Sequence, residues 1–600
     1  MVATPKFEAW PNLVTMFFEQ VEAHGEAPFL WAKHDDRYQA LTWREVAAQV
    51  SELGRGLQAL GIGKGDRVVL VAENRPEWLI SDLAIMAAGA ITVPAYTTNS
   101  VADHLHILQD SGAKGAILST KRLAERFLPA AHESAKLKFV ITMEAPDRGQ
   151  NLSAEVIPWR DALTRGDKTH ANMVADALKI RRNDTACIIY TSGTGGAPKG
   201  VMLDHSSILH NCAGAADALM ELGLGKEVFL SFLPLSHSYE HTAGQFFPMS
   251  IGAQIYYAEG ADTLGANMLE ARPTIMTAVP RLYETLHARI SRGVKQAGGV
   301  KEKLFNKALN LGRKRYQDPD SLSLGERLLD HALTALVRKK VRSRFGGRLK
   351  ALVSGGAPLN PDIGIFFTAL GLRILQGYGL TESAPVISVN RPSGPKMHTV
   401  GPPLIHTQVR IAEDGEICVK GDLVMQGYWN NEDATREAIT DGWLHTGDIG
   451  HLDEKGRLLI TDRKKDIIVN SGGDNLSPQR IEGFLTLEPE ILQAMVYGDR
   501  RPHLVALLVP DGEWMHAWAM ERNKSIEPAV LAGDGEFQKA IAEAVERVNT
   551  RLSNIEKVRK FILADGPFTI DNGQMTPTMK IRRHVIRDTY GPRLDALFGG

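Results

Sequence analysis

The sequence predicts an α/β protein with a large helix-covered domain of mainly parallel sheet and a smaller C-terminal domain. Three observations carry this prediction. Helix and strand patterns alternate along residues 40–130 and again along 186–290 and 349–390, a rhythm typical of parallel sheets covered by helices on both faces. Residues 402–460 change to short strands and turns, and after Asp466 helices and strands begin afresh.

Composition and charge limit the classes of function. At 600 residues the chain is too long for one hydrophobic core, so at least two domains are expected. Hydrophobic residues make up 44% and charged residues 23%, which is ordinary for a soluble globular protein. The formal net charge of −1 gives no electrostatic argument for binding nucleic acid.

Cysteine usage and the first residues predict a cytoplasmic protein. The cysteines lie far apart, without the spacing of metal ligands, and are predicted to be buried, reduced thiols: Cys187, Cys212 and Cys418. Residues 1–6 lack the apolar core of a signal peptide. No run of about 18 apolar residues predicts a membrane span. The segment 80–95 comes nearest, and we interpret it as a buried helix leading to a strand.

The first predicted helix of the repeating pattern begins with a capping box, because Thr42 and Glu45 have the required spacing. This helix runs to about Leu60 and ends at a Gly-Ile-Gly turn. The elements predicted after it are a strand at 68–71, a helix at 77–88, a strand at 91–94 and a buried strand at 186–189.

The change of pattern near residue 402 divides the chain. Short strands are predicted at 409–412, 416–420 and 457–461, with turns between them, which favours a small antiparallel subdomain over 402–461. A new series of helix and strand patterns begins after Asp466. It predicts a boundary between an N-terminal domain over 1–462 and a C-terminal domain over 463–600.

A basic helical insertion is predicted at 289–348. It holds 16 lysines and arginines against five acidic residues, a local charge of +11. One interpretation is a basic face that docks on anionic lipid as a peripheral contact. The other is a solvated helical insertion with no partner.

Residues 190–200 read Tyr-Thr-Ser-Gly-Thr-Gly-Gly-Ala-Pro-Lys-Gly and follow the predicted strand at 186–189. Small residues allow backbone N–H groups to approach an anion, hydroxyl groups add donors, and Lys199 adds a mobile positive charge. The stretch therefore predicts a loop that holds a polyphosphate, although it does not have Walker spacing. A flexible turn with a surface lysine is the alternative.

Six further segments stand out along the chain. Residues 353–359 carry Gly355, Gly356 and Ala357 after a strand, where bare backbone can lie against a purine. The other segments are 376–383, 443–448, 462–466, 470–475 and 577–583.

Together with the loop at 190–200, these segments resemble, in the same order, those of the adenylate-forming enzymes. Within that family, the pattern of the sequence is most similar to that of bacterial long-chain fatty acyl-CoA synthetases. The resemblance covers nearly the whole chain and completes the predicted fold class: two helix-covered, mainly parallel sheets, a small β-barrel-like subdomain, and a small mobile α+β lid. Gly195 departs from the family, which usually has a second threonine there, and so removes one hydroxyl donor from the loop.

The resemblance implies ATP as a substrate and assigns the residues that bind it. The phosphate loop contributes Thr191, Ser192, Gly193, Thr194 and Lys199. The adenosine contacts are Gly355, Gly356, Ala357, Gln376, Tyr378, Gly379, Asp448 and Arg463. Tyr378 can stack on the purine, and a carboxylate such as Asp448 can accept two hydrogen bonds from a ribose diol.

The same resemblance implies Mg²⁺ and a small catalytic set. Glu382 is a hard oxygen ligand suited to Mg²⁺ between phosphates, with Thr191 as the second predicted ligand. Thr381 can donate to an α-phosphate oxygen. His237 matches a histidine beside the acyl and pyrophosphate sites. Lys580 is expected to hold carboxylate and α-phosphate together as charge develops.

The implied reaction is a two-step ligation of a long-chain fatty acid to coenzyme A, through an acyl-adenylate. Lys465 matches the family hinge, and Gly472 and Gly473 are expected to border the coenzyme A channel. A fatty acyl-AMP ligase that loads a carrier protein, a synthetase for medium-chain or aryl acids, and a binding protein without catalysis remain alternatives. A homodimer is common among relatives and is a further expectation.

Overall fold

The computed structural model describes residues 7–146, 153–166, 172–191, 197–260, 262–576 and 580–599. Within these residues, two sheets of eight strands form the body of the molecule. The first has the order β15-β14-β13-β12-β10-β11-β1-β2. Its strands are β1 Pro28–His34, β2 Arg37–Thr42, β10 Val228–Ser231, β11 Gln254–Tyr257, β12 Ile275–Ala278, β13 Ala351–Ser354, β14 Ile374–Gly379 and β15 Val386–Val389.

The second sheet has the order β18-β9-β8-β4-β3-β5-β6-β7. Its strands are β3 Arg67–Val71, β4 Ile91–Pro94, β5 Gly115–Leu118, β6 Phe139–Thr142, β7 Glu155–Pro158, β8 Thr185–Thr191, β9 Lys199–Asp204 and β18 Gly427–Tyr428. The central pairs of both sheets are parallel, and only strands toward the ends pair antiparallel. The predicted mainly parallel α/β architecture is therefore confirmed.

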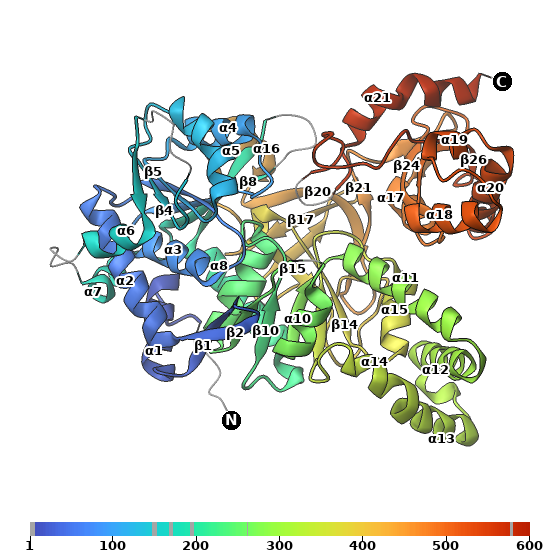
Figure 1. Ribbon diagram of the computed structural model, residues 1–600, viewed down its shortest axis with the longest axis horizontal. Helices are drawn as coiled ribbons and strands as arrows, with labels where there is room; N and C mark the ends of the chain where they lie inside the picture. The colour runs from blue at the N-terminus through green and yellow to red at the C-terminus, as the bar shows by residue number, and fades with distance from the viewer. Residues whose placement is uncertain are drawn as a thin grey trace.

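Helices cover both sheets (Figure 1). They include α1 Leu13–His24, α2 Trp43–Ala59, α3 Pro76–Ala87, α4 Val101–Ser111, α5 Lys121–His132, α6 Trp159–Arg165, α7 Met173–Ala177, α8 His205–Leu219, α9 Phe247–Ser250, α10 Leu264–Ala271 and α15 Pro361–Ala369. The capping box predicted for α2 is present, with both Thr42–Glu45 hydrogen bonds formed. Eleven residues of α3 are buried, so this helix lies inside the protein and leads into β4, as predicted.

A curled antiparallel sheet and a separate C-terminal unit follow. The curled sheet holds β16 Gln408–Ile411, β17 Glu416–Lys420, β19 Ile439–Thr440, β20 Trp443–Leu452 and β21 Leu458–Arg463, with α16 Glu432–Ala438 beside it. One strand of this region, β18, instead pairs with β9 in the second large sheet. The region predicted as a small antiparallel subdomain over 402–461 thus also contributes a strand to the second large sheet.

The C-terminal unit is an α+β domain beside the curled sheet (Figure 1). Its strands are β22 Ile468–Val469, β23 Asn475–Leu476, β24 Ile491–Tyr497, β25 Leu504–Pro510 and β26 Val558–Leu563. Its helices are α17 Pro478–Leu485, α18 Gly512–Glu521, α19 Pro528–Ala532, α20 Gly535–Asn549 and α21 Arg583–Asp595. It has its own hydrophobic core, which includes Leu485 of α17, Ala506 of β25 and Phe537 of α20.

The basic segment folds as helices at the periphery of the molecule (Figure 1). These are α11 Pro280–Ala297, α12 Gly299–Gln317, α13 Leu324–Leu333, the π-helical segment η4 Thr334–Arg338 and α14 Lys339–Ser343. No helix among the described ranges combines the length and apolar character needed to cross a bilayer. The three cysteines are buried and form no disulfide.

Candidate active site

The strand before the predicted phosphate loop ends at the edge of the site. β8 ends at Thr191, which pairs with Lys199 at the start of antiparallel β9. The loop that joins them carries Ser192, Gly193, Thr194 and Gly195, and these predicted residues lie outside the described residues. The Lys199 ammonium lies 4.9 Å from the centre of the Tyr428 ring, a cation–π arrangement that directs this charge toward β18.

Tyr428 links Lys199 to the predicted magnesium ligand. Its hydroxyl donates to Glu382 Oε1 at 2.9 Å. Glu382 lies on the short helical turn η5 Thr381–Ser383, which follows β14. Thr381 lies on the same turn, and its hydroxyl group is 3.0 Å from the hydroxyl group of Ser238, which comes from a distant part of the chain. The structure therefore brings the predicted Thr381, Glu382 and Lys199 to one region from separate parts of the sequence.

Glu382 offers the donor chemistry that Mg²⁺ prefers. Among the residues that the structure describes, no cluster of three or more histidine, cysteine, aspartate or glutamate side chains suits a metal ion. A single carboxylate is sufficient for Mg²⁺ that arrives on substrate phosphates, because this ion keeps most of its ligands from phosphate and water. Thr191, the other predicted ligand, has its hydroxyl 3.5 Å from the Lys199 carbonyl oxygen.

Asp448 is held by two other predicted residues. The Tyr378 hydroxyl donates to Asp448 Oδ2 at 2.6 Å, and Arg463 Nε lies 3.7 Å from Oδ1. The antiparallel register of β20 and β21 places Asp448 opposite Arg463. Burial raises the pKa of Asp448, while Arg463 and Tyr378 oppose that rise.

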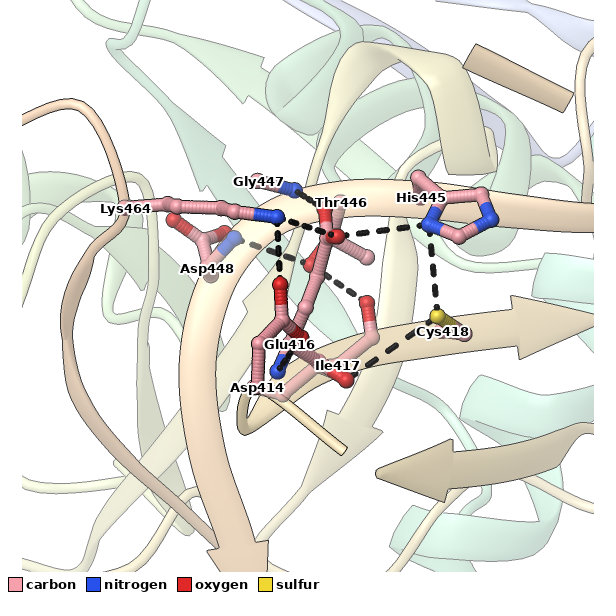
Figure 2. Close-up of polar contacts among 9 residues, drawn as sticks. All are labelled: Asp414, Glu416, Ile417, Cys418, His445, Thr446, Gly447, Asp448 and Lys464. Atoms are coloured by element: carbon pink, nitrogen blue, oxygen red, sulfur yellow. Dashed lines mark hydrogen bonds and ion pairs between the residues drawn. The ribbon is translucent and has the colours of Figure 1, made fainter. Parts of the chain in front are cut away.

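A polar network fixes the turn that carries Asp448 (Figure 2). Glu416 on β17 accepts from the Gly447 backbone N–H at 2.9 Å and from the Lys464 ammonium at 3.1 Å. Burial raises the pKa of Glu416, but the hydrogen bonds from Gly447, Lys464 and His445, together with the charge of Lys464, hold it below its ordinary value. The Thr446 hydroxyl donates to the Ile417 carbonyl at 2.7 Å and accepts from the Asp448 N–H at 3.1 Å.

The predicted glycine turn lies against an aromatic wall. A Cβ atom at Gly355 would come within 2.9 Å of the Tyr239 ring, so a side chain there would displace that ring. Gly356 has a φ of +81°, a conformation that favours glycine, and exposed Ala357 follows it. Gly379 passes so close to the Pro385 carbonyl that no Cβ would fit.

Gln376 on β14 has an unused acceptor. Gln376 is buried, and its side-chain oxygen has no hydrogen-bond partner in the described part of the chain. A buried acceptor of this kind is normally satisfied. Gln376 lies opposite Ser354, the residue before the glycine turn, and its free oxygen could accept a hydrogen bond from a ligand.

Lys580 and His237 come together from the two domains. The Lys580 ammonium is close enough to the Asp448 and Glu382 carboxylates to interact with both. Desolvation by the surrounding protein, with the charge of Arg463, lowers the Lys580 pKa. Burial lowers the pKa of His237 to about 4, and Lys580 adds to that effect, so this imidazole is neutral at pH 7.

The local contacts of His237 define its tautomer. The Tyr239 backbone N–H donates to His237 Nδ1 at 3.2 Å. A neutral imidazole that accepts at Nδ1 carries its hydrogen on Nε2. His237 can therefore offer one uncharged N–H donor to a ligand.

Lys580 is positioned by a partly buried ion pair that involves Arg583, three residues further on. Both guanidinium nitrogens of Arg583, at the start of α21, donate to the Glu482 carboxylate, at 2.7 Å and 2.5 Å. Glu482 also accepts from the Val496 N–H at 2.7 Å. This bidentate pair fixes the segment that carries Lys580 to α17 and β24.

An apolar cavity adjoins Tyr239. Tyr239 and Ala243 line it, the latter from η2 Glu240–Phe246, a π-helical segment shortly after His237. The remaining lining residues come from α8, α9, strands of the first sheet and the segment after them: Ala215, Ala218, Leu219, Phe229, Phe247, Ile275, Thr277, Val353, Val386, Val389 and Leu404. Apolar walls of this kind suit a hydrocarbon chain.

Three predicted residues lie outside this cluster. Lys465 is exposed in the turn between β21 and β22. Gly472 and Gly473 form the turn between β22 and β23, where Gly473 has a φ of +86° and Asn470 accepts from the Gly472 N–H at 2.8 Å. The structure does not bring these residues to Lys580 or Glu382.

Four residues that contact the candidate site were not predicted from the sequence: Tyr428, Ser238, Glu416 and Glu482. Tyr428 and Glu382 are 46 residues apart, and Glu416 and Gly447 are 31 apart. No spacing rule connects such pairs, since strand pairing brings them together. The sequence signal available for Tyr428 was its place in an aromatic pair after a glycine.

Comparison with known proteins shows which family the chain resembles over most of its length. Residues 17–429 match the family model described as AMP-binding enzyme, and residues 465–599 match the AMP-binding enzyme C-terminal domain. The chain is 35% identical to the long-chain-fatty-acid–CoA ligase FadD15 of Mycobacterium tuberculosis, over 98% of this chain and 97% of the relative. It is 31% identical to the peroxisomal long chain acyl-CoA synthetase 6 of Arabidopsis thaliana, over 94% and 82%.

Solved structures share the fold at lower sequence identity. The A domain of a carboxylic acid reductase from Segniliparus rugosus, in complex with AMP and a co-purified carboxylic acid, has a TM-score of 0.78 at 20% identity, over 100% of this chain and 97% of that one. ATP-bound MatB from Rhodopseudomonas palustris has a TM-score of 0.68 at 21% identity, over 97% and 99%. With its family matches and its full-length relatives, this chain belongs to the AMP-binding enzyme family.

Proposed function

We propose that the protein is an AMP-forming ligase that joins a long-chain fatty acid to coenzyme A. The observation that carries this proposal is the electrostatic interaction of Lys580 with Glu382, Asp448 and His237, next to a cavity lined mostly by apolar side chains. The full-length relatives named as long-chain acyl-CoA ligases support the same substrate class.

In the first step, a carboxylate oxygen of the fatty acid attacks the α-phosphorus of ATP, and the bond to the β-phosphate oxygen breaks to release pyrophosphate. Lys580 holds the carboxylate and an α-phosphate oxygen as negative charge develops between them. Thr381 and the neutral His237 donate hydrogen bonds. The predicted loop residues and Lys199 hold the outer phosphates, and Asp448 with Arg463 hold the ribose.

Bound Mg²⁺ would neutralise phosphate charge and orient the triphosphate. Glu382 is the proposed protein ligand, with Thr191 as a second ligand. Tyr428 orients the Glu382 carboxylate through its hydrogen bond.

In the second step, the coenzyme A sulfur attacks the acyl carbonyl, loses its proton, and AMP leaves with the C–O bond electrons. We infer that the domain over 463–600 rotates relative to 1–462 about Lys465, so that Gly472 and Gly473 replace Lys580 at the site. Two glycines leave room there for the thiol arm of coenzyme A.

The proposal also covers where the enzyme is located, whether it contacts a membrane, and its oligomeric state. We infer a cytoplasmic protein that contacts a membrane surface through the insertion 289–348, because this segment carries a charge of +11. A homodimer is a further prediction, which light scattering of the purified protein would test.

The experiment that tests the proposed function measures AMP release from Mg-ATP with acetate, octanoate, palmitate, oleate or 4-coumarate, each with and without coenzyme A. Coenzyme-A-dependent release that is greatest with palmitate or oleate supports the proposal. Release that ignores coenzyme A would instead indicate an enzyme that loads a carrier protein. A maximum at octanoate or 4-coumarate would reassign the acid.

Replacing Lys580 should separate the two steps. Lys580→Ala should lower acyl-adenylate formation by roughly a hundredfold or more, since the developing charge loses a mobile cation. Thioester formation from supplied acyl-adenylate should stay within about twofold of the parent rate. Lys560→Ala, in the same domain, is the control. Equal losses in both steps would contradict the assigned role of Lys580.

A further inference from the structure

A row of exposed leucines runs along the outer helices of the basic insertion. α13, η4 and α14 follow one another without a break from Leu324 to Ser343. On this rod Leu324, Leu328 and Leu336 have 81%, 76% and 53% of their surface exposed. Leu329 is also exposed, and we call these four residues the leucine row. Figure 1 shows the rod at the outer edge of the molecule.

The opposite face of the rod is fixed to the protein, so the leucine row cannot turn inward. Leu333 is buried, and Arg338 is only 2% exposed. The Arg338 guanidinium donates to Asp330 Oδ1 at 2.6 Å and to the carbonyl oxygens of Ala308 and Ala369, both at 2.8 Å. These contacts tie the rod to α12 and α15 and set which face meets solvent.

Positive charges accompany the leucine row. Lys339, Lys340, Arg342 and Arg344 are all exposed at its C-terminal end. Both acidic residues of the rod are already engaged: Glu326 accepts from Lys314 at 2.8 Å, and buried Asp330 binds Arg338 and Arg315. Nearby Asp320 lies 3.8 Å from Arg327. The end of the rod therefore presents apolar side chains beside an excess of positive charge.

We propose that the leucine row inserts into an anionic lipid bilayer, with Lys339, Lys340, Arg342 and Arg344 on the lipid headgroups. Amphipathic helices with leucines beside basic residues bind such interfaces through apolar burial and electrostatic attraction together. A second copy of the chain fits this surface less well, because pairing would bring two identical positive clusters together. The inference rests on the proposed function, since a long-chain fatty acid partitions into lipid and would be met there.

The test is co-sedimentation of the full-length protein with vesicles of phosphatidylcholine, alone or mixed with phosphatidylglycerol. The parent protein should bind the mixed vesicles, and binding should weaken at high salt because exposed charges are screened. The variant Leu324→Ser/Leu328→Ser/Leu336→Ser should bind roughly tenfold more weakly, or weaker still, because the apolar side chains that enter the bilayer are lost. The variant Leu178→Ser/Leu269→Ser/Leu452→Ser removes three exposed leucines elsewhere and should bind as the parent does.

A second variant tests the charges. Lys339→Gln/Lys340→Gln should reduce binding to mixed vesicles at low salt and have little effect on the weak binding to phosphatidylcholine alone. Parent-like binding of the leucine variant, or parent binding that ignores phosphatidylglycerol, would overturn the proposal. A parent dimer that the leucine variant converts to monomer would also overturn it, and would assign the surface to a second copy.

Ligase activity without vesicles separates this proposal from the proposed function. The leucine variant should form acyl-CoA from a dispersed fatty acid at the parent rate, because the leucine row is outside the site. If no acid supports AMP release by the parent protein, the proposed function fails, whereas the vesicle result still decides the docking surface.

Discussion

His237 and His241 are four residues apart but lie in different surroundings. His237 is beside Lys580, whereas His241 turns into the protein and bonds Asp82 of α3 at 2.8 Å, with both side chains buried. Between them, Tyr239 lines the apolar cavity, and its hydroxyl donates to the Val353 carbonyl at 2.9 Å. Along this one segment, neighbouring side chains thus form the proposed ligand contact, the wall of the cavity and an internal anchor.

Glu240 is a buried acid in the same segment, and it predicts a pH dependence of stability. Burial raises its pKa from 4.5 to about 7, although the Thr277 hydroxyl donates to it at 2.6 Å. An acid with a raised pKa in the folded state keeps its proton after the unfolded state has lost it. Stability is therefore lost as pH rises from about 4.5 to 7, by up to roughly 3 kcal/mol.

Glu240→Gln should remove this loss. The free energy of unfolding of the variant, minus that of the parent, should increase between about pH 4.5 and pH 8, as measured by urea denaturation at fixed pH steps. Exposed Glu521→Gln is the control for a lost charge. A difference that stays constant over this range would show that Glu240 is not the responsible group.

At the scale of elements, β17 determines where the turn of β20 lies. Glu416 accepts from Gly447 and Lys464, so one carboxylate joins three segments of the curled sheet (Figure 2). The adjacent Asp414 also binds Lys464, at 2.6 Å, but the contacts shown for it do not reach the Asp448 turn. The two acids thus share a cation while differing in their relation to the site.

Glu416→Gln should weaken ATP binding. The glutamine side chain lacks the negative charge that holds Lys464, and its hydrogen bond to the Gly447 N–H is weaker. The turn is then held less firmly, so Asp448 loses its fixed position. We expect the KM for ATP to rise about tenfold with a smaller change in kcat, measured by AMP release under saturating fatty acid. Asp414→Asn is the matched control, and an equal rise in its KM would assign the effect to Lys464 rather than to the turn.

Sequence reasoning located elements and motif residues better than contacts between them. The capping box at Thr42 and the Gly-Ile-Gly turn that ends the same helix are local signals, and both appear in the structure. The antiparallel subdomain was recognised by its turns, but the pairing of β18 with β9 depends on tertiary packing. The contact of Tyr428 with Glu382 follows from that pairing, so the aromatic pair that marks Tyr428 in the sequence does not predict its partner.

At the scale of the whole molecule, ion pairs join the C-terminal domain to the body in the arrangement that brings Lys580 to Glu382. Arg292 of α11 pairs with Glu513 of α18, and Arg551, which follows α20, pairs with Asp362 of α15. Asn360 adds a hydrogen bond to the Gly483 carbonyl at 3.2 Å. Under the proposed mechanism these contacts must break before the second step, so they favour the first.

Weakening the ion pairs between the two domains should shift the balance between the two half-reactions. Exposed ion pairs contribute little individually, so Asp362→Asn/Glu513→Gln should destabilise this arrangement by on the order of 1 kcal/mol, about a fivefold change in its population relative to the rotated one. Single-turnover adenylation should slow by up to that factor, while thioester formation from supplied acyl-adenylate should be unchanged or faster. Glu432→Gln/Asp433→Asn, which removes two exposed acids that pair with Arg436, should change neither step. Slower thioester formation in the Asp362 and Glu513 variant would mean that these ion pairs also serve the second step, and the contacts would then not select between the two arrangements.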